Sequence, residues 1–151
     1  AELEANSGAV DDAIARLLSV NRANVDPEVP ALLSELYEKK GQKAQASSYL
    51  KEAFALYDLL LKRYPAAFYD HATEFYLGPG GDSKRALVLA LANLKNRPTE
   101  RAYRLVMDAS FEAKDWATAC KTARMIENRP SRSVAFLDSR TRALQKCKLQ
   151  K

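Results

Sequence analysis

Regularly spaced prolines constrain this chain more than any other feature. Four of them stand at positions 27, 65, 98 and 130, so that consecutive prolines are 38, 33 and 32 residues apart. The last two occupy nearly identical stretches, Asn96-Arg97-Pro98-Thr99 and Asn128-Arg129-Pro130-Ser131. Asparagine tolerates the left-handed backbone that ends a helix, proline blocks continuation, and threonine or serine caps the next helix. The spacing therefore predicts turns at regular intervals between helices.

A second series marks turns inside each unit. It consists of Gly8, Gly41, Gly81 and Lys114, each followed five residues later by an alanine, namely Ala13, Ala46, Ala86 and Ala119. The alanines are 33, 40 and 33 residues apart. Small residues at this recurring spacing predict helix pairs that pack closely at the same point of each unit. Dissimilar surroundings for any two of these alanines, or a strand between them, would contradict this register.

The hydrophobic periodicity within the units is helical. Apolar residues recur at steps of three and four along residues 48–64, which gives this segment one wide apolar face. No segment alternates with period two for long enough to form a strand. With 47% hydrophobic and 28% charged residues, the chain is expected to be globular and soluble. Because no run approaches about eighteen apolar residues, we expect no insertion into a membrane.

Three units carry similar patterns of large and small residues. The second unit has Leu33-Ser34-x-x-Tyr37 followed by Ala46-x-x-x-Leu50. The third has Phe68-x-x-His71-Ala72-x-x-Phe75 with Ala86-x-x-x-Ala90, and the fourth has Tyr103-x-x-Val106-Met107-x-x-Ser110 with Ala119-x-x-x-Ala123. In these positions the chain resembles the tetratricopeptide repeat (TPR) family, with degenerate units. The family's unit is a helix–turn–helix of about 34 residues.

The resemblance implies an all-α fold, a right-handed helix–turn–helix solenoid of about four units with a closing helix over residues 131–148. Residues 1–151 would form a single TPR-like domain, the C-terminal part of a longer repeat protein. The third unit contains Gly78-Pro79-Gly80-Gly81, which we interpret as an inner turn enlarged by two residues. Asp82 follows it where a phosphate-binding loop needs a lysine, so the sequence favours a turn over a nucleotide site.

Successive first helices of such a solenoid line a concave wall, and this wall is the expected binding site. The repeat register places these side chains on it: Glu35, Glu38, Tyr69, Thr73, Tyr76, Arg101, Arg104, Asp108, Phe111 and Arg140. Their composition suits a peptide or partner segment with an acidic end. Tyr69 and Tyr76 would supply apolar anchors, while Arg101 and Arg104 would hold a carboxylate. The alternative is that both tyrosines belong to the repeat core.

The sequence contains no motif for catalysis or for a metal or cofactor. His71 is the only histidine, and Asp70 beside it does not face it on a helix. Two cysteines and one distant histidine do not make the four ligands of a zinc site. We therefore expect a non-enzymatic protein. Counted from Pro130, Cys147 lies about seven residues further along its helix than Cys120, roughly 10 Å, which favours two thiols over a disulfide.

A basic C-terminal third suggests an alternative partner. Residues 118–151 hold nine Lys or Arg and two Asp or Glu, a composition that would suit nucleic acid or another acidic surface. Only Phe136 is interleaved with these charges as an aromatic residue. The sequence therefore favours a solvated basic cap over a nucleic-acid site.

Homo-oligomerisation is a further alternative. The helix expected over residues 9–22 would expose a face containing Ile14, Leu17 and Leu18, and such a face attracts a neighbouring segment or a second copy. Residues 1–60 also carry 6 Lys or Arg against 10 Asp or Glu, whereas residues 61–151 carry 18 against 9. This asymmetry fits an oriented charged partner or head-to-tail association. The sequence indicates no cellular compartment.

Overall fold

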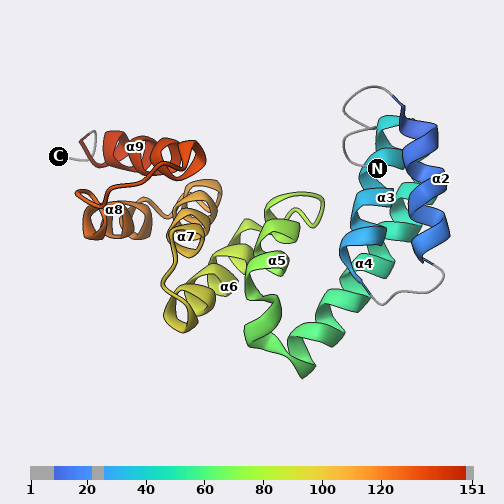
Figure 1. The fold of residues 1–151 in the computed structure, drawn as a ribbon, viewed down its shortest axis with the longest axis horizontal. Coiled ribbons are helices and arrows are strands. Elements are labelled where there is room, and N and C mark those ends of the chain that lie inside the picture. Colours follow the sequence, from blue (N-terminus) through green and yellow to red (C-terminus); the bar gives the residue numbers. More distant parts are fainter. Residues whose placement is uncertain (1–8, 22–25, 149–151) are drawn as a thin grey trace. The chain divides into compact units, whose positions relative to one another are not determined.

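All regular secondary structure in the described part of the chain is α-helical (Figure 1). The computed structural model describes residues 9–21 and 26–148. The helices are α2 (Val10–Asn21), α3 (Glu28–Lys39), α4 (Lys43–Arg63), α5 (Pro65–Leu77), α6 (Ser83–Asn96), α7 (Glu100–Glu112), α8 (Trp116–Met125) and α9 (Val134–Lys148). The expected all-α fold is thereby confirmed.

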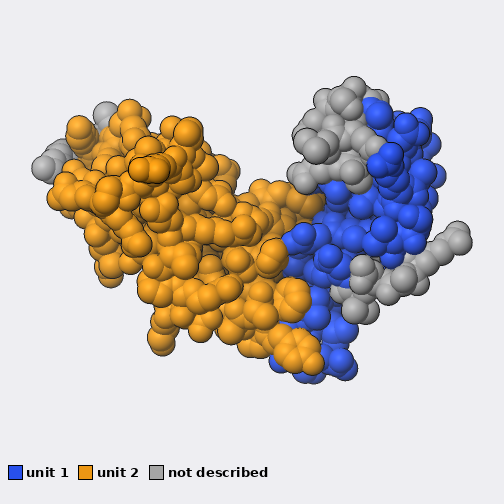
Figure 2. Space-filling view, in the orientation of Figure 1, with its two compact units in different colours: residues 1–63 blue, residues 64–151 orange. Residues whose placement is uncertain are grey.

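The chain divides into two compact units, residues 1–63 and residues 64–151 (Figure 2). In the first unit α3 packs against both α2 and α4. In the second unit each helix from α5 to α8 packs against the next one along the chain. Helix α7 also contacts α5 and α9, so that these three helices adjoin in one row. This row carries the candidate site.

The four alanines of the predicted register occupy equivalent positions. Ala13, Ala46, Ala86 and Ala119 are each the fourth residue of their helices, α2, α4, α6 and α8. Each is at most 4% exposed. Each also donates its backbone N–H to the carbonyl four residues earlier, at 3.0, 3.1 or 2.9 Å, and that carbonyl belongs to the residue just before the helix. An alanine at this point lets the helix approach its neighbour closely.

The turns inside the predicted helix–turn–helix repeats share one backbone feature. Gly41, Gly81 and Lys114 have φ angles of 71°, 62° and 58°, in the left-handed region, whereas Gly8, the first of the predicted series, lies outside the described residues. Three residues link α3 to α4 and α7 to α8, whereas five link α5 to α6. The Gly-Pro-Gly-Gly stretch is therefore a turn enlarged by two residues, as predicted. It ends at Asp82, whose carboxylate caps α6 by accepting a 2.9 Å hydrogen bond from the Arg85 N–H.

The turns between the predicted helix–turn–helix repeats differ from the expectation in the backbone conformation of their asparagines. Helix α6 ends at Asn96, but the backbone leaves it through Arg97 in an extended conformation, with φ −140°. Among the described non-glycine residues, only Lys114 has a positive φ, so the expected left-handed asparagines are not formed. Thr99 does cap α7, as predicted, by accepting a 3.2 Å hydrogen bond from the Ala102 N–H. Before α9 the cap is Ser133, not the expected Ser131.

The core of the first unit corrects one expectation about the surface. Ile14 and Leu17 of α2 are 6% and 8% exposed, because they pack against Val29 and Leu33 of α3 in one buried cluster. Leu18 is partly buried beside them. The exposed apolar face expected over residues 9–22 is therefore not formed by these side chains, and their burial removes the argument for association through them.

In the second unit, α9 completes the core. Phe136 is 1% exposed and packs with Met107 of α7 and with Ala119 and Ala123 of α8. Ala143, further along α9, belongs to the same cluster. Helix α9 therefore closes the second unit over both preceding helices, which sets the positions of its polar residues against α7.

Candidate binding site

A carboxylate of α5 is held by two arginines of α7. Glu74 Oε2 accepts from Arg101 Nη2 at 2.7 Å, and its Oε1 accepts from Arg104 Nη2 at 2.9 Å. The two arginines lie three residues apart, on neighbouring positions of one helical face. The sequence predicts that Arg101 and Arg104 hold a carboxylate of a partner, whereas in the structure they hold a carboxylate of this chain.

The same face continues to α9 through Asp108. Arg104 uses its other terminal nitrogen to donate to Asp108 Oδ2 at 3.1 Å, four residues along α7. Asp108 Oδ1 accepts from Ser139 Oγ at 2.6 Å and from Arg142 Nη2 at 2.9 Å, both on α9. Ser139 and Arg104 are largely or partly buried, so these pairs are better shielded from solvent than ordinary surface ion pairs. Asp108 thereby ties α7 to α9.

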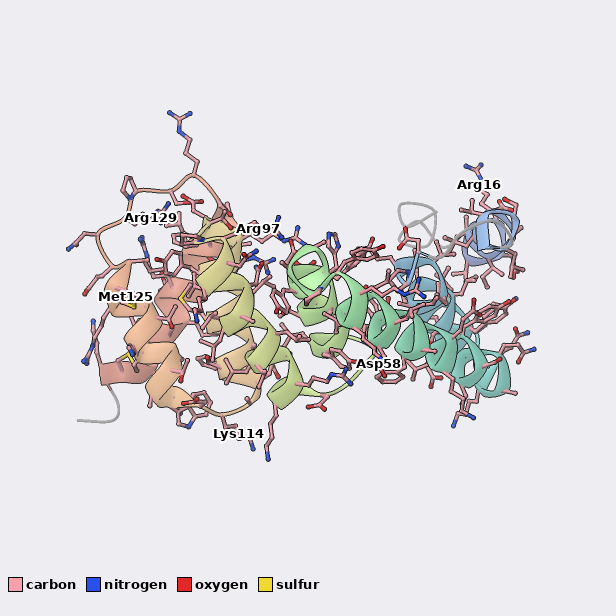
Figure 3. The ribbon with its side chains drawn as sticks, turned by 90° about the horizontal axis from the view of Figure 1, so that it is seen from below. Arg16, Asp58, Arg97, Lys114, Met125 and Arg129 are labelled. Atoms are coloured by element: carbon pink, nitrogen blue, oxygen red, sulfur yellow. A yellow bond between two sulfur atoms is a disulfide. The ribbon has the colours of Figure 1, made fainter. Side chains whose placement is uncertain are left out.

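At the other end of the row, two arginines that are more exposed than Arg104 flank a carboxylate of α5. Asp70, whose side chain is 14% exposed, lies 3.4 Å from Arg97 Nη2 and 3.6 Å from Arg101 Nε. Arg97 extends from the turn after α6 (Figure 3). His71 Nε2 stands 4.0 Å from Asp70 Oδ1, beyond hydrogen-bond distance. We call the row formed by Arg97, Asp70, Arg101, Glu74, Arg104, Asp108 and Arg142 the charge ladder.

A cleft of about 460 Å³ opens where α5 ends beside α7 and α9. Its volume falls in the range of small-ligand or side-chain pockets. The lining residues are Leu77, Arg104, Asp108, Glu112, Ala135, Asp138, Ser139 and Arg142. Three helices of one unit contribute them, and the charge ladder fixes several of their side chains in place.

Aromatic side chains flank the ladder on the α8 side. Phe111 and Trp116 meet edge to face, with ring centroids 5.0 Å apart. The Arg142 guanidinium lies 4.4 Å from the centroid of the Phe111 ring, and Lys146 lies at the same distance from that of Trp116. These cation–π contacts hold the two basic side chains of α9 against α7 and α8. Phe111 thus contacts the ladder, although it does not line the cleft.

Two of the residues predicted for the wall lie in the core instead. Thr73 is fully buried, and its hydroxyl donates to the Tyr69 carbonyl at 2.7 Å. Tyr76 is 1% exposed, with the Arg85 guanidinium of α6 4.4 Å from its ring centroid. Helix α5 packs against both α6 and α7, so two of its sides are covered. Tyr69 is half-buried. Tyr76 is therefore a core residue, which was the alternative to its predicted role as an apolar anchor.

Three further predicted residues do not line the cleft. Glu35 and Glu38 are exposed on α3, which belongs to the first unit, whereas the ladder and the cleft belong to the second. Arg140 donates to the carbonyls of Ile126 and Arg129, at 3.0 and 2.6 Å. It therefore holds the connection that follows α8. Of the ten predicted residues, Arg101, Arg104 and Asp108 belong to the ladder.

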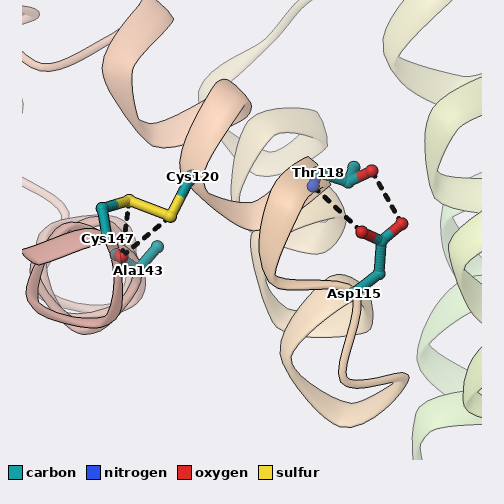
Figure 4. The surroundings of a disulfide bond; sticks show 5 residues. All are labelled: Asp115, Thr118, Cys120, Ala143 and Cys147. Carbon is teal, nitrogen blue, oxygen red and sulfur yellow. Dashed lines mark hydrogen bonds between the residues drawn. A yellow bond between two sulfur atoms is a disulfide. The ribbon is translucent and has the colours of Figure 1, made fainter. Parts of the chain in front are cut away.

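Cys120 and Cys147 form a disulfide, with their Cα atoms 5.5 Å apart (Figure 4). The preference for two free thiols was therefore wrong. A tight turn at Pro130 would keep the two cysteines apart, but residues 126–133 form a longer connection between α8 and α9. Figure 4 shows Cys147 on a helix seen nearly end-on, so α9 crosses α8 instead of running back alongside it. The crossing brings the last turn of α9 to Cys120.

The start of α8 carries a perturbed carboxylate. The Thr118 N–H donates to Asp115 Oδ1 at 3.0 Å, and the Thr118 hydroxyl donates to Oδ2 at 2.7 Å. These two hydrogen bonds favour the charged form, so the pKa of Asp115 lies below its ordinary value. Asp115 is thus the N-cap of α8, next to the left-handed Lys114 (Figure 3).

Sequence reasoning missed most members of the ladder and the cleft. Asp70 and Glu74 lie four residues apart on α5, so this helix carries two negative charges on one face. Arg101 and Arg104 lie three residues apart on α7, so that helix carries two positive charges on one face. This complementarity between consecutive first helices was the available signal. Nothing in the sequence alone indicated that Arg142 of α9 would reach Asp108.

The chain matches no protein-family model, no curated protein and no solved structure. Within residues 9–21 and 26–148 no group of three or more His, Cys, Asp or Glu side chains is arranged to hold a metal ion. None of the described helices combines the length and the apolar character needed to cross a bilayer.

Proposed function

We propose that this chain is a non-enzymatic, TPR-like helical-repeat module that binds a segment of a partner protein along α5, α7 and α9. The observation that carries the proposal is the cleft of about 460 Å³ at the meeting point of these three helices. Its walls are held by the charge ladder before any partner arrives. A preformed site loses less conformational entropy on binding than one that must first be ordered.

The recurring local geometry supports a repeat module. The same buried alanine stands fourth in α2, α4, α6 and α8, and the same left-handed turn precedes three of these helices. In repeat proteins each helix pair contacts mainly its neighbours, and the first helices together form an extended binding surface. The row of α5, α7 and α9 has the corresponding place in the second unit. Partner binding is the function that such a surface performs.

The arrangement of reactive side chains favours binding over catalysis. Asp70 is engaged by two arginines, so it is poorly placed to orient His71 as a general base. Both cysteines are used in the disulfide, which leaves neither as a nucleophile. In the basic C-terminal third, Arg140 and Arg142 already have partners within the chain. A protein segment is therefore a better candidate partner than nucleic acid.

The proposal is tested by selecting peptides from a random displayed library on the whole chain. The decisive variant is Ala135→Trp, which fills the cleft from the exposed first turn of α9. Ala55→Trp, on an exposed position of α4, is the matched control. We expect selected peptides to bind the wild-type chain and the control alike, and to bind Ala135→Trp at least about tenfold more weakly. Failure to select any peptide, or equal binding by Ala135→Trp, would contradict the proposal.

A further inference from the structure

We infer that the cleft takes a basic group, a Lys or Arg side chain of the partner segment. This inference rests on the proposed function and names the chemistry of the bound segment. It reverses the acidic end expected from the sequence. The reason lies in which charges of the cleft are already paired within the chain and which are not.

The positive charges of the cleft are paired. Arg104 donates to Glu74 and to Asp108, at 2.9 and 3.1 Å, and Arg142 donates to Asp108 at 2.9 Å. A ligand carboxylate seeking either guanidinium would have to displace one of these internal carboxylates. Such an exchange replaces one charge-assisted hydrogen bond with another and deprives Glu74 or Asp108 of one of its arginine partners. The cleft therefore offers little to an acidic group.

The unpaired charges of the cleft are negative. Glu112 on α7 and Asp138 on α9 are exposed, and within the described residues neither side-chain carboxylate makes a hydrogen bond or an ion pair. Together with Asp108 they give the lining three carboxylates against the two arginines, a formal balance of −1. The protein as a whole carries a net charge of +5. A positively charged ligand is therefore attracted to this cleft, whereas the net positive charge of the protein disfavours its binding elsewhere.

The shape of the cleft suits a long basic side chain. Glu112 and Asp138 come from two helices that pack against each other, so a cation between them would meet carboxylates on both sides. Leu77 and Ala135 supply apolar surface in the same lining. Lysine and arginine side chains bury their methylene stems on apolar surface while their charged ends remain near polar groups. A basic side chain therefore uses both kinds of lining residue.

The test compares an acetylated Lys-Ala repeat peptide with a Glu-Ala repeat peptide of the same length on the isotope-labelled whole chain. We expect the Lys-Ala peptide to shift the amide NMR signals of residues 108–112 and 135–142, and the Glu-Ala peptide to leave them unchanged. Glu112→Gln/Asp138→Asn should weaken Lys-Ala binding roughly fivefold to tenfold, and about 0.5 M salt should weaken it as well. The matched control, Asp12→Asn/Glu127→Gln, removes two exposed carboxylates elsewhere and should bind like the wild type.

Three results would overturn the inference: no shifts in the cleft with the Lys-Ala peptide, shifts there with the Glu-Ala peptide alone, or unchanged Lys-Ala binding by the Glu112→Gln/Asp138→Asn variant. The library selection separates this failure from failure of the proposed function. Selected peptides that Ala135→Trp excludes but that lack basic residues would leave partner binding intact and remove the basic-group inference. Absence of any peptide sensitive to Ala135→Trp would remove both.

Discussion

The guanidinium of Arg104 lies 2.9 Å from the carboxylate of Glu74, 30 residues earlier in the chain. This pair joins α7 to α5, and the other end of the same guanidinium joins Asp108, which in turn holds α9. One arginine thereby connects the three helices that line the cleft. The ladder therefore fixes α5, α7 and α9 relative to one another, and its arginines are paired with carboxylates of the chain itself.

Replacing Arg104 by alanine should destabilise the protein. The side chain is only 25% exposed, and its loss deprives both Glu74 and Asp108 of a partner. We expect the free energy of unfolding to fall by about 1–2 kcal/mol, measured by urea titration. Arg132→Ala is the control, since Arg132 is exposed and has no ion pair within the described residues. Equal stability of the two variants would show that the Arg104 pairs do not support the fold.

Removing the disulfide should lower the free energy of unfolding more than Arg104→Ala does. Cys120 and Cys147 are 27 residues apart, and closing a loop of this size is worth roughly 3–4 kcal/mol in the chain-entropy description. We expect Cys120→Ala/Cys147→Ala to unfold at a correspondingly lower urea concentration. Adding a thiol reductant should lower the stability of the wild type to a similar degree and leave the double variant unchanged. A wild type indifferent to reductant would argue against the bond.

The left-handed turns predict opposite effects for two substitutions. Lys114 adopts φ 58°, which costs a side-chain-bearing residue about 1–2 kcal/mol, so Lys114→Gly should stabilise the protein by up to about 1 kcal/mol. Gly41 has φ 71°, and an added Cβ would meet nothing within 4 Å. Gly41→Ala therefore isolates the backbone effect and should destabilise by a similar amount. Thermal unfolding checks both, and shifts of the same sign would contradict the shared turn geometry.

The capping carboxylate of α8 predicts a pH dependence. The pKa of Asp115 is lowered in the folded state, so its stabilising effect is complete above the ordinary aspartate pKa of about 3.9. The effect is lost as the pH falls through the lower folded value. We expect Asp115→Asn to be less stable than wild type by about 0.5–1 kcal/mol near pH 6, and the difference to shrink as the pH falls below about 3.9. A difference independent of pH would mean that the cap acts without its charge.

The local features of the fold were predictable from the sequence. Glycines 41 and 81 and the alanines after them act through backbone conformation and close packing, which depend on a few neighbouring residues. The GPGG turn and the Thr99 cap follow from the same local chemistry. These features do not depend on where distant helices lie, so the spacing of glycine, proline and capping residues is enough to predict them.

The features that depend on how helices cross were not predictable. Adjacent positions on a helix point in directions about 100° apart, so a modest error in the predicted rotation of a helix about its axis exchanges its surface and core positions. Thr73 and Tyr76, which were expected on the binding wall, are therefore in the core. The disulfide depended on the crossing of α9 over α8, which residues 126–133 permit but do not specify. The pairing of Asp108 with Arg142 spans 34 residues and follows from the same crossing. Such long-range contacts are set by the packed helices together.

The central claim, that the row of α5, α7 and α9 is a preformed binding face, is tested most directly by mapping a bound segment. The measurement is the change in amide NMR signals of the labelled chain when a library-selected peptide is added. The account predicts that the largest changes gather on residues 104–112 and 135–142, around the cleft. Changes concentrated on α2, α3 or α4, with the signals of α7 and α9 unmoved, would contradict it.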